Sequence, residues 1–321
     1  LFGLCLARQC CEVLAALDGG DILELGAGAG ELAADLLDGL KTAACLPGRY
    51  LILEPGPELR ERQRDLLRAR HPDVMDRIQW LDDLPLGFAG VLVANEVMDA
   101  LPVHRFQVRE EDEIAEILVK PRGTGWEEVG AEPPSRGLAE AVQALWAQGL
   151  AQEPGYASEI NLRLGPWIQA LATSMTRGLM LLIDYGYDRA DYYRPERGMG
   201  TLMCHYRHQA HGDPYVHLGL QDITAHVDFS AAANVGRAAG LAVAGFATQA
   251  HFLIALGLDD LLAERIGGDS ATAEEDLKWL LGAKQLVLPS AMGERFRVLG
   301  LAKDLDQTWA GFSLRDLRGR L

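Results

Sequence analysis

Three glycines at alternate positions, Gly26, Gly28 and Gly30, follow a short apolar run at residues 21–25. Glycine in such a turn lets the backbone approach a ligand closely, because it lacks a Cβ and adopts conformations that other residues avoid. The dinucleotide fingerprint G-x-G-x-x-G needs a glycine at position 31, where the chain has Glu31. An acid at the first helical residues would repel a pyrophosphate. The spacing therefore disfavours NAD, which stays as a remote alternative.

Carboxylates stand at the ends of the strands predicted nearby. Glu24 lies near the end of the first apolar run, and Glu54 directly follows the run 50–53. A carboxylate in the position of Glu54 could accept hydrogen bonds from both hydroxyls of a ribose. Asp82 follows the run 78–81 and is either a ligand-binding acid or a solvated turn residue. Together with the glycines, these acids predict a nucleoside-binding site at one edge of a sheet.

A second pair of acids follows the predicted strand 90–94. Glu96 and Asp99 are three residues apart, which would place both on one face of a helical turn at the ligand-binding edge of the sheet. A guanidinium is a poor nucleophile because it is protonated and delocalised, and paired carboxylates can bind it and polarise its charge. The pair is therefore suited to bind a cationic group such as a guanidinium, with Asn95 orienting the loop or binding the substrate. The alternative is a pair of helix N-terminal acids favoured by the helix dipole.

Further candidate site residues come later in the chain. Asp184 ends the predicted strand 178–184 and is a candidate wall of the same site. Asp222, His226 and Asp228 are candidates to converge there. For these four residues, a purely structural role is an equal alternative.

Histidines gather between residues 205 and 226. The spacing His205-x-x-His208-x-x-His211 could imitate a metal site. It would present three ligands on one face only in a helix, and Gly212 and Pro214 indicate a loop here. We therefore expect no metal, and histidines that form hydrogen bonds within a loop.

The composition narrows the class of partner. The chain has 321 residues, a formal net charge of −16 and 49% hydrophobic residues. Such a charge would repel nucleic acid on average and suits a cationic protein partner, although acidity also serves solubility alone. No apolar run is long enough to predict membrane insertion. The 5 cysteines include no C-x-x-C pair, which disfavours a disulfide framework and fits a reducing compartment.

Alternating apolar runs and amphipathic segments predict an α/β fold with a mostly parallel, doubly wound sheet and helices on both faces. The predicted strands are 21–25, 50–53, 78–81, 90–94, 178–184, 241–248 and 295–301. The predicted helices are 4–17, 31–40, 58–70, 138–149, 163–176 and 229–239, with more over 249–285.

The core is predicted to comprise residues 1–102 and 163–321. Residues 103–162 form an insertion over the active-site edge, with a possible hairpin at 103–119 and an irregular Gly/Pro-containing stretch at 121–137. A long loop at 185–224 lies within the core and is a candidate lid, because long loops are often functional.

Three blocks carry a family resemblance: N-E-x-x-D-A-L-P-V at 95–103, D-Y-G-Y at 184–187 and Q-D-I-T-A-H-V-D-F at 221–229. In this order they resemble the MidA family, the mitochondrial complex I assembly methyltransferases and their bacterial relatives. The pattern E-x-G-x-G-x-G at 24–30 resembles motif I of class I methyltransferases. Family members usually carry an earlier segment with a G-D-F-x-T-A-P-E-type motif near the cofactor, and a chain truly lacking it is expected to bind that cofactor poorly.

The resemblance implies a Rossmann-like class I methyltransferase with S-adenosyl-L-methionine (SAM) as cofactor and a protein arginine, on a subunit like that of complex I, as methyl acceptor. It implies that Asp82 stands where such enzymes commonly contact the adenine. It also implies a location in the bacterial cytoplasm or the mitochondrial matrix. Two alternatives remain: a SAM enzyme acting on a small molecule or RNA, and a SAM-binding assembly factor without catalysis.

Overall fold

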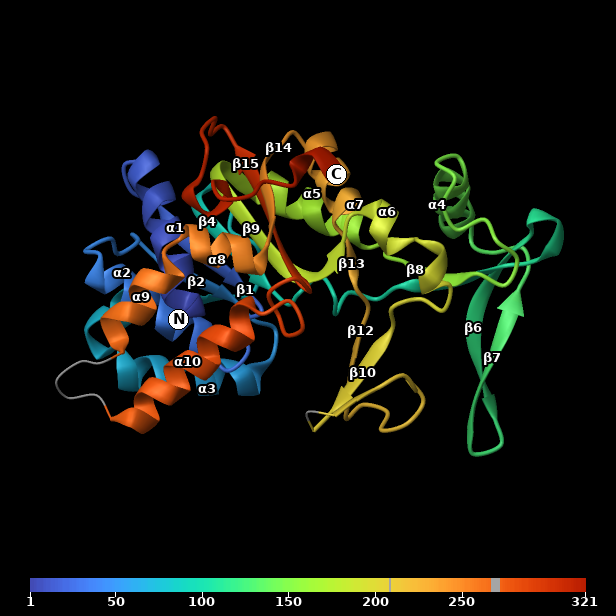
Figure 1. Cartoon of the computed structure of the whole chain (residues 1–321), viewed down its shortest axis with the longest axis horizontal. Coiled ribbons are helices and arrows are strands. Elements are labelled where there is room, and N and C mark those ends of the chain that lie inside the picture. The colour runs from blue at the N-terminus through green and yellow to red at the C-terminus, as the bar shows by residue number, and fades with distance from the viewer. Residues whose placement is uncertain (208, 267–271) are drawn as a thin grey trace. The chain divides into compact units, whose positions relative to one another are not determined.

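The structure, a computed structural model, describes residues 1–207, 209–266 and 272–321 (Figure 1). The chain divides into two compact units. The larger unit comprises Leu1–Val97, Ile168–Tyr185 and Ala233–Leu321. The smaller unit comprises Met98–Trp167 and Gly186–Ala232, so the whole predicted insertion 103–162 and all of the predicted lid loop 185–224 except Tyr185 belong to it.

The larger unit is built on a sheet with the strand order β14-β15-β9-β4-β1-β2-β3. Strands β9, β4, β1, β2 and β3 pair in parallel, whereas β15 runs antiparallel to both β9 and β14. This confirms the predicted mostly parallel sheet. The strands are β1 (Asp21–Leu25), β2 (Tyr50–Leu53), β3 (Ile78–Leu81), β4 (Phe88–Asn95), β9 (Met175–Tyr187), β14 (Ala242–Thr248) and β15 (Phe296–Lys303).

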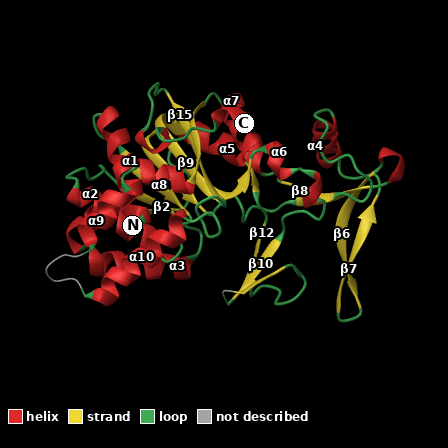
Figure 2. Cartoon of the chain, viewed as in Figure 1, coloured by secondary structure: helices red, strands yellow, loops and turns green. Residues whose placement is uncertain are grey.

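Helices pack around this sheet, as Figure 2 shows in red and yellow. The central strands are buried along nearly their whole length, which explains why they read as continuous apolar runs rather than alternating ones. One face of the sheet packs against α1, α2, α8 and α9. The helices are α1 (Phe2–Ala16), α2 (Glu31–Thr42), α3 (Pro57–Arg70), α5 (Leu164–Ser174), α7 (Phe229–Ala238), α8 (Gln249–Ala255), α9 (Leu258–Arg265) and α10 (Ala273–Val287).

The smaller unit contains a four-stranded antiparallel sheet of order β7-β6-β5-β8 and a three-stranded sheet of order β11-β10-β12. Helix α4 (Arg136–Trp146) supplies Leu138, Val142 and Leu145 to a core that also holds Phe106. The remaining elements are β5 (His104–Val108), β6 (Ile114–Arg122), β7 (Gly125–Ala131), β8 (Ala157–Ile160), α6 (Arg189–Tyr192), β10 (Met203–Tyr206), β11 (Gln209–His211), β12 (Asp222–Thr224) and β13 (Val227–Asp228). Strand β13 pairs in parallel with the end of β9.

Two sequence predictions differ from this arrangement. The hairpin within 103–119 is confirmed as β5 and β6, but the stretch 121–137 holds the further strand β7. The prediction that 185–224 is an extended loop is wrong, because it contains α6 and strands β10, β11 and β12. These strands are only 3 or 4 residues long, too short for an alternating pattern to reveal them.

Among the residues that the structure describes, no helix combines the length and the apolar character needed to cross a membrane.

Candidate functional site

The glycine turn between β1 and α2 has a left-handed backbone at each of its three glycines. The φ angles are 63° at Gly26, 53° at Gly28 and 93° at Gly30. A Cβ added at Gly28 would meet no atom within 4 Å, so the backbone there borders open space. A Cβ at Gly26 would lie 3.3 Å from Cγ2 of Val97. The sequence therefore provides an accessible backbone turn at the carboxyl end of β1, where open α/β sheets bind ligands.

Glu24 lies inside the sheet, two residues before the glycine turn. Its side chain is buried, and Oε2 accepts a hydrogen bond of 2.6 Å from the hydroxyl of Tyr50 on β2. Burial raises the pKa of Glu24 to about 7, against the opposing effect of the Tyr50 hydrogen bond. Glu24 is thus a buried carboxyl with a partner on the neighbouring strand, and its predicted contact with the cofactor remains a prediction.

The ends of β2 and β3 are joined by Arg60, a residue that the sequence reasoning did not identify. Its guanidinium donates to the carbonyl oxygens of Glu54 and Leu81, the latter at 2.6 Å, and to Oδ1 of Asp82 at 2.7 Å. The carboxylate of Glu54 is buried and accepts a hydrogen bond of 2.9 Å from the backbone N–H of Gly56. Arg60 therefore brings together the backbone of Glu54 and the side chain of Asp82, two residues that the sequence predicted for the cofactor.

A second unpredicted residue, Gln63, supports the glycine turn. It lies one turn after Arg60 on α3 and is fully buried. Its Nε2 donates to the carbonyl oxygen of Gly28 at 2.8 Å, and its Oε1 accepts from Nε1 of Trp80 at 2.8 Å. The sequence signal that could have marked it is an uncharged polar residue within the strongly charged helix α3.

The first acid after β4 does not lie in a helix. Glu96 has φ 53°, a left-handed conformation that is uncommon for residues other than glycine. Its backbone N–H donates to the carbonyl oxygen of Ile183 on β9 at 2.9 Å. Nδ2 of Asn95 lies 3.5 Å from Oε1 of Glu96. The predicted helical turn is wrong, because this bond and the left-handed residue turn the chain away at the end of β4.

Asp99 belongs to a turn of the smaller unit in which the N–H of Leu101 donates to the carbonyl oxygen of Met98 at 3.2 Å. Asp99 is buried, and it lines a cavity within the smaller unit. The backbone oxygen of Asp99 accepts a hydrogen bond of 3.0 Å from the N–H of Ala225. The turn after Met98 is thereby fixed to the segment that follows β12.

Asp184 is fully buried within β9, the strand that pairs directly with β4. The strand continues to Tyr187, so Asp184 does not end it as predicted. Its Oδ1 accepts a hydrogen bond of 2.9 Å from the N–H of Tyr185, and its Cα pairs with that of Arg297 on β15. Its role as a wall of the site remains a prediction.

The other three candidates lie in the smaller unit, each with its own partners. Asp222 is exposed and pairs across the strands with His205. His226 packs its ring against Tyr187, with ring centroids 5.4 Å apart, and its backbone N–H donates to Oγ1 of Thr201. Their predicted convergence remains a prediction.

Asp228 has a structural role. It accepts hydrogen bonds of 2.9 Å from Arg189 and from the N–H of Ala231 in the first turn of α7. Burial raises the pKa of Asp228, although the nearby Arg189 guanidinium opposes the shift. This residue therefore ties α7 to α6.

The histidine spacing considered for a metal includes His208, which lies outside the described residues. His205 and His211 lie on the paired strands β10 and β11. Within residues 1–207, 209–266 and 272–321, no group of three or more His, Cys, Asp or Glu side chains could hold a metal ion.

The chain is similar to known proteins over most of its length. A solved structure of a protein from Burkholderia thailandensis bound to S-adenosyl-homocysteine superposes with a TM-score of 0.93 at 36% identity, covering 100% of this chain and 81% of that one. The protein arginine methyltransferase NDUFAF7, mitochondrial, of Danio rerio is 29% identical over 308 residues, which cover 86% of this chain and 67% of the relative. That of Rattus norvegicus is 31% identical over 240 residues, and the match spans 70% of this chain and 49% of the relative.

A family model, Methyltransf_28, matches residues 5–247, well over half of the chain. Its description is that of an S-adenosyl-L-methionine-dependent methyltransferase. The parallel sheet with its antiparallel strand β15, and the glycine turn after β1, agree with this match. The chain belongs to this family of SAM-dependent methyltransferases.

Proposed function

We propose that this chain transfers a methyl group from SAM to a guanidinium nitrogen of an arginine side chain in a partner protein, such as a subunit resembling that of complex I. The observation that carries the proposal is the left-handed Glu96, held by its backbone directly after β4. The curated relatives from Danio rerio and Rattus norvegicus, which bear the name protein arginine methyltransferase, support the same acceptor.

The residues of the larger unit fit SAM. The open backbone at Gly28 accommodates a ligand that a side chain would displace. Glu54, buried at the end of β2, is suited to accept hydrogen bonds from ribose hydroxyls, and the exposed carboxylate of Asp82 follows β3. We assign Glu24, Gly26 and Gly30 to the support of this turn. When bound, SAM supplies an electrophilic methyl group on a cationic sulfur.

The acids after β4 supply what an arginine acceptor needs. A guanidinium keeps its proton at any physiological pH, so the protein must bind it as a cation and orient one nitrogen. The carboxylates of Glu96 and Asp99 are suited to accept its N–H groups and to draw positive charge away from the reacting nitrogen. The same carboxylates can accept the proton that the methylated nitrogen releases. Asn95, Asp184, Asp222 and His226 are proposed to shape the site around them.

The test is methyl transfer by the whole protein, with Glu96→Gln as the variant and Glu111→Gln as its matched control. Glu111 is also an exposed glutamate in a left-handed conformation, with φ 59°, so both substitutions have a similar backbone setting. Isotope-labelled SAM is supplied to a desalted cell extract, and hydrolysed protein is analysed for methylarginine. We expect Glu96→Gln to lower methylarginine formation by about 100-fold or more, and Glu111→Gln to leave it unchanged.

The other outcomes identify the alternatives. Binding of S-adenosylhomocysteine is measured on each variant, and it should stay within about threefold of the original value if Glu96 acts on the acceptor. Label in RNA or in a small molecule would replace the arginine acceptor. Binding of SAM without any labelled product would favour an assembly factor without catalysis.

A further inference from the structure

A cavity of about 360 Å³ lies wholly within the smaller unit, with Asp99 in its wall. Its volume falls in the range of about 300–1,000 Å³ that is typical of ligand pockets. Apart from Asp99, the lining is largely apolar and includes Val103, Ile117, Val119 and Ile223. The cavity thus combines a largely apolar lining with Asp99, a candidate acid for binding the acceptor.

One wall of the cavity is a single face of the four-stranded sheet. The pairing of Phe106 with Glu116 sets a register that, continued along the strands, places Val103 opposite Val119. Residues paired across antiparallel strands share a face, as do alternate residues of one strand. Ile117 therefore lies on the same face as Val119, and both side chains line the cavity.

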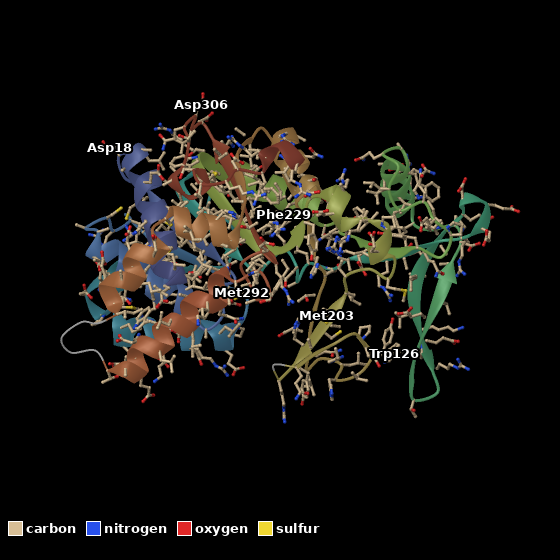
Figure 3. All side chains as sticks on the ribbon, in the orientation of Figure 1. Asp18, Trp126, Met203, Phe229, Met292 and Asp306 are labelled. Carbon is tan, nitrogen blue, oxygen red and sulfur yellow. The ribbon has the colours of Figure 1, made fainter. Side chains whose placement is uncertain are left out.

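The apolar face continues beyond the cavity along the β6–β7 hairpin. Pro121 pairs with Trp126, two residues further from the cavity on each strand. Trp126 is 44% exposed and Val119 is 46% exposed. Figure 3 labels Trp126 on this hairpin and Met203 on β10, the strand next to the cavity-lining β12.

The other wall comes from the segment around β12. Ile223 on this strand and Tyr215 in the preceding loop both line the cavity. The hydroxyl of Tyr215 donates to Oε1 of Glu128 on β7 at 2.8 Å, which fastens this wall to the sheet. Nε2 of Gln221 donates to the carbonyl oxygen of Pro214 at 3.0 Å and so closes the loop between them. The two walls are thus bonded to each other.

Among the lining residues that the structure describes, Arg105 is the only basic one, and an acidic partner neutralises its charge. Its guanidinium forms an ion pair and hydrogen bond with Glu128. Although burial alone would raise the pKa of Glu128, the hydrogen bonds from Arg105 and Tyr215 lower it, so this partner stays ionised. The charge of Arg105 therefore does not oppose the entry of an apolar group or of a second cation, and Asp99 is an acidic residue of the lining.

We propose that this cavity binds an apolar side chain of the acceptor protein that neighbours the methylated arginine. The inference rests on the proposed function, because it takes Asp99 to bind the guanidinium. An apolar side chain in the cavity would be removed from water against Val103, Ile117, Val119 and Ile223, which favours binding. Asp99 at the wall limits how far from that side chain the arginine can lie, so the cavity selects acceptor sequences.

Peptide binding to the whole protein, saturated with S-adenosylhomocysteine, tests the proposal. The probes are fluorescein-labelled glycine–serine peptides with a central arginine, in which one leucine is placed at each of the three positions on either side. A second set carries glutamine in place of the arginine. Fluorescence anisotropy gives the Kd of each peptide.

The chain offers a matched pair of variants. Val119→Asn alters the cavity, whereas Leu118→Asn alters the neighbouring residue on the opposite face of β6, which is almost equally exposed at 45%. Ile223→Ser alters the second wall and provides an independent variant. Thermal melting establishes that each variant is folded.

We expect at least one leucine position to lower Kd by tenfold or more relative to the glycine–serine peptide that has the central arginine and no leucine. This gain should fall below about threefold in Val119→Asn and Ile223→Ser and persist in Leu118→Asn. The proposal is overturned if no leucine position lowers Kd by tenfold, or if Val119→Asn and Leu118→Asn behave alike. The two peptide sets separate a failure of the cavity proposal from a failure of the proposed function. If leucine still lowers Kd while the arginine and glutamine peptides bind equally, the arginine site is refuted and the binding of an apolar side chain in the cavity is retained.

Discussion

The side chain of Gln63 donates a hydrogen bond of 2.8 Å to the carbonyl oxygen of Gly28. Because the same amide accepts from Nε1 of Trp80, it connects α3, the glycine turn and β3. The turn therefore does not depend on its glycines alone for its shape. The buried Gln63 also stabilises it, through one hydrogen bond to the turn and one to β3.

Replacing Gln63 by leucine should loosen this turn. The substitution keeps the side-chain size and removes both hydrogen bonds, leaving the carbonyl oxygen of Gly28 and Nε1 of Trp80, which are part-buried in these bonds, without their partner. We expect a loss of about 1–3 kcal/mol in the free energy of unfolding and roughly tenfold weaker binding of S-adenosylhomocysteine. Urea unfolding and calorimetric titration measure the two effects. Gln79→Leu, on the exposed side of β3, is the control, and equal affinities for the two variants would contradict the supporting role.

Adding a methyl group at Gly28 should block the cofactor. Gly28 and Gly87 both have positive φ angles, 53° and 71°, and an added Cβ at either position meets no atom within 4 Å. The backbone cost of Gly→Ala is therefore similar, about 1 kcal/mol. Only Gly28→Ala should also weaken the binding of S-adenosylhomocysteine, by tenfold or more in a calorimetric titration. Unchanged affinity in Gly28→Ala, or an equal loss in Gly87→Ala, would remove the glycine turn from the cofactor site.

Substitutions of Arg60 and Asp82 should weaken cofactor binding to different extents. Arg60→Met removes the donor that joins the ends of β2 and β3, whereas Asp82→Ala removes only one exposed carboxylate. We expect Arg60→Met to weaken the binding of S-adenosylhomocysteine more than Asp82→Ala does, and Asp83→Ala to have no effect. Isothermal titration gives the order. If Asp82→Ala matched Asp83→Ala, Asp82 would have no part in the cofactor site.

The buried Glu24 should make stability depend on pH. The pKa of Glu24 is about 7 in the folded protein, raised by burial from the ordinary glutamate value of 4.5, so the folded state holds a proton that the unfolded state releases between these values. The stability contributed by the protonated carboxyl is complete below pH 4.5 and declines as the pH rises towards 7, by at most about 1.4 kcal/mol per pH unit. Glu24→Gln keeps an acceptor for the Tyr50 hydroxyl and removes the titration. In urea unfolding from pH 4.5 to 8, the free energy of unfolding of Glu24→Gln should rise relative to that of the original protein as the pH rises. Parallel plots of the two free energies against pH would contradict the buried proton.

The glycine turn and the acids at the ends of β2 and β3 could be located from the sequence because their signals are local, whereas their contacts with the cofactor remain predictions. A glycine turn after an apolar strand, and acids directly after Leu53 and Leu81, keep their meaning without knowledge of the tertiary structure. Arg60 could not be selected in this way, since α3 contains several other arginines. Only the meeting of the ends of β2 and β3 distinguishes it.

The acceptor side shows the limits of spacing arguments. Acids at positions i and i+3 fit a helix, but the left-handed Glu96 excludes one here. The wall formed by Ile223 was hidden for a different reason. A strand of 3 residues such as β12 is defined by its partner β10 rather than by its own pattern.

The hydrogen bond between Tyr215 and Glu128 joins positions 87 residues apart in the chain. Different stretches of the gene thus encode the two walls of the cavity. Because the walls are bonded to each other, a change in the shape of one wall alters its packing against the other. Under the role that we propose for the cavity, a descendant that shifts its acceptor preference is expected to accumulate linked substitutions in both stretches. Diversification of this family should therefore leave a trace of covariation between the β6–β7 hairpin and the segment around β12.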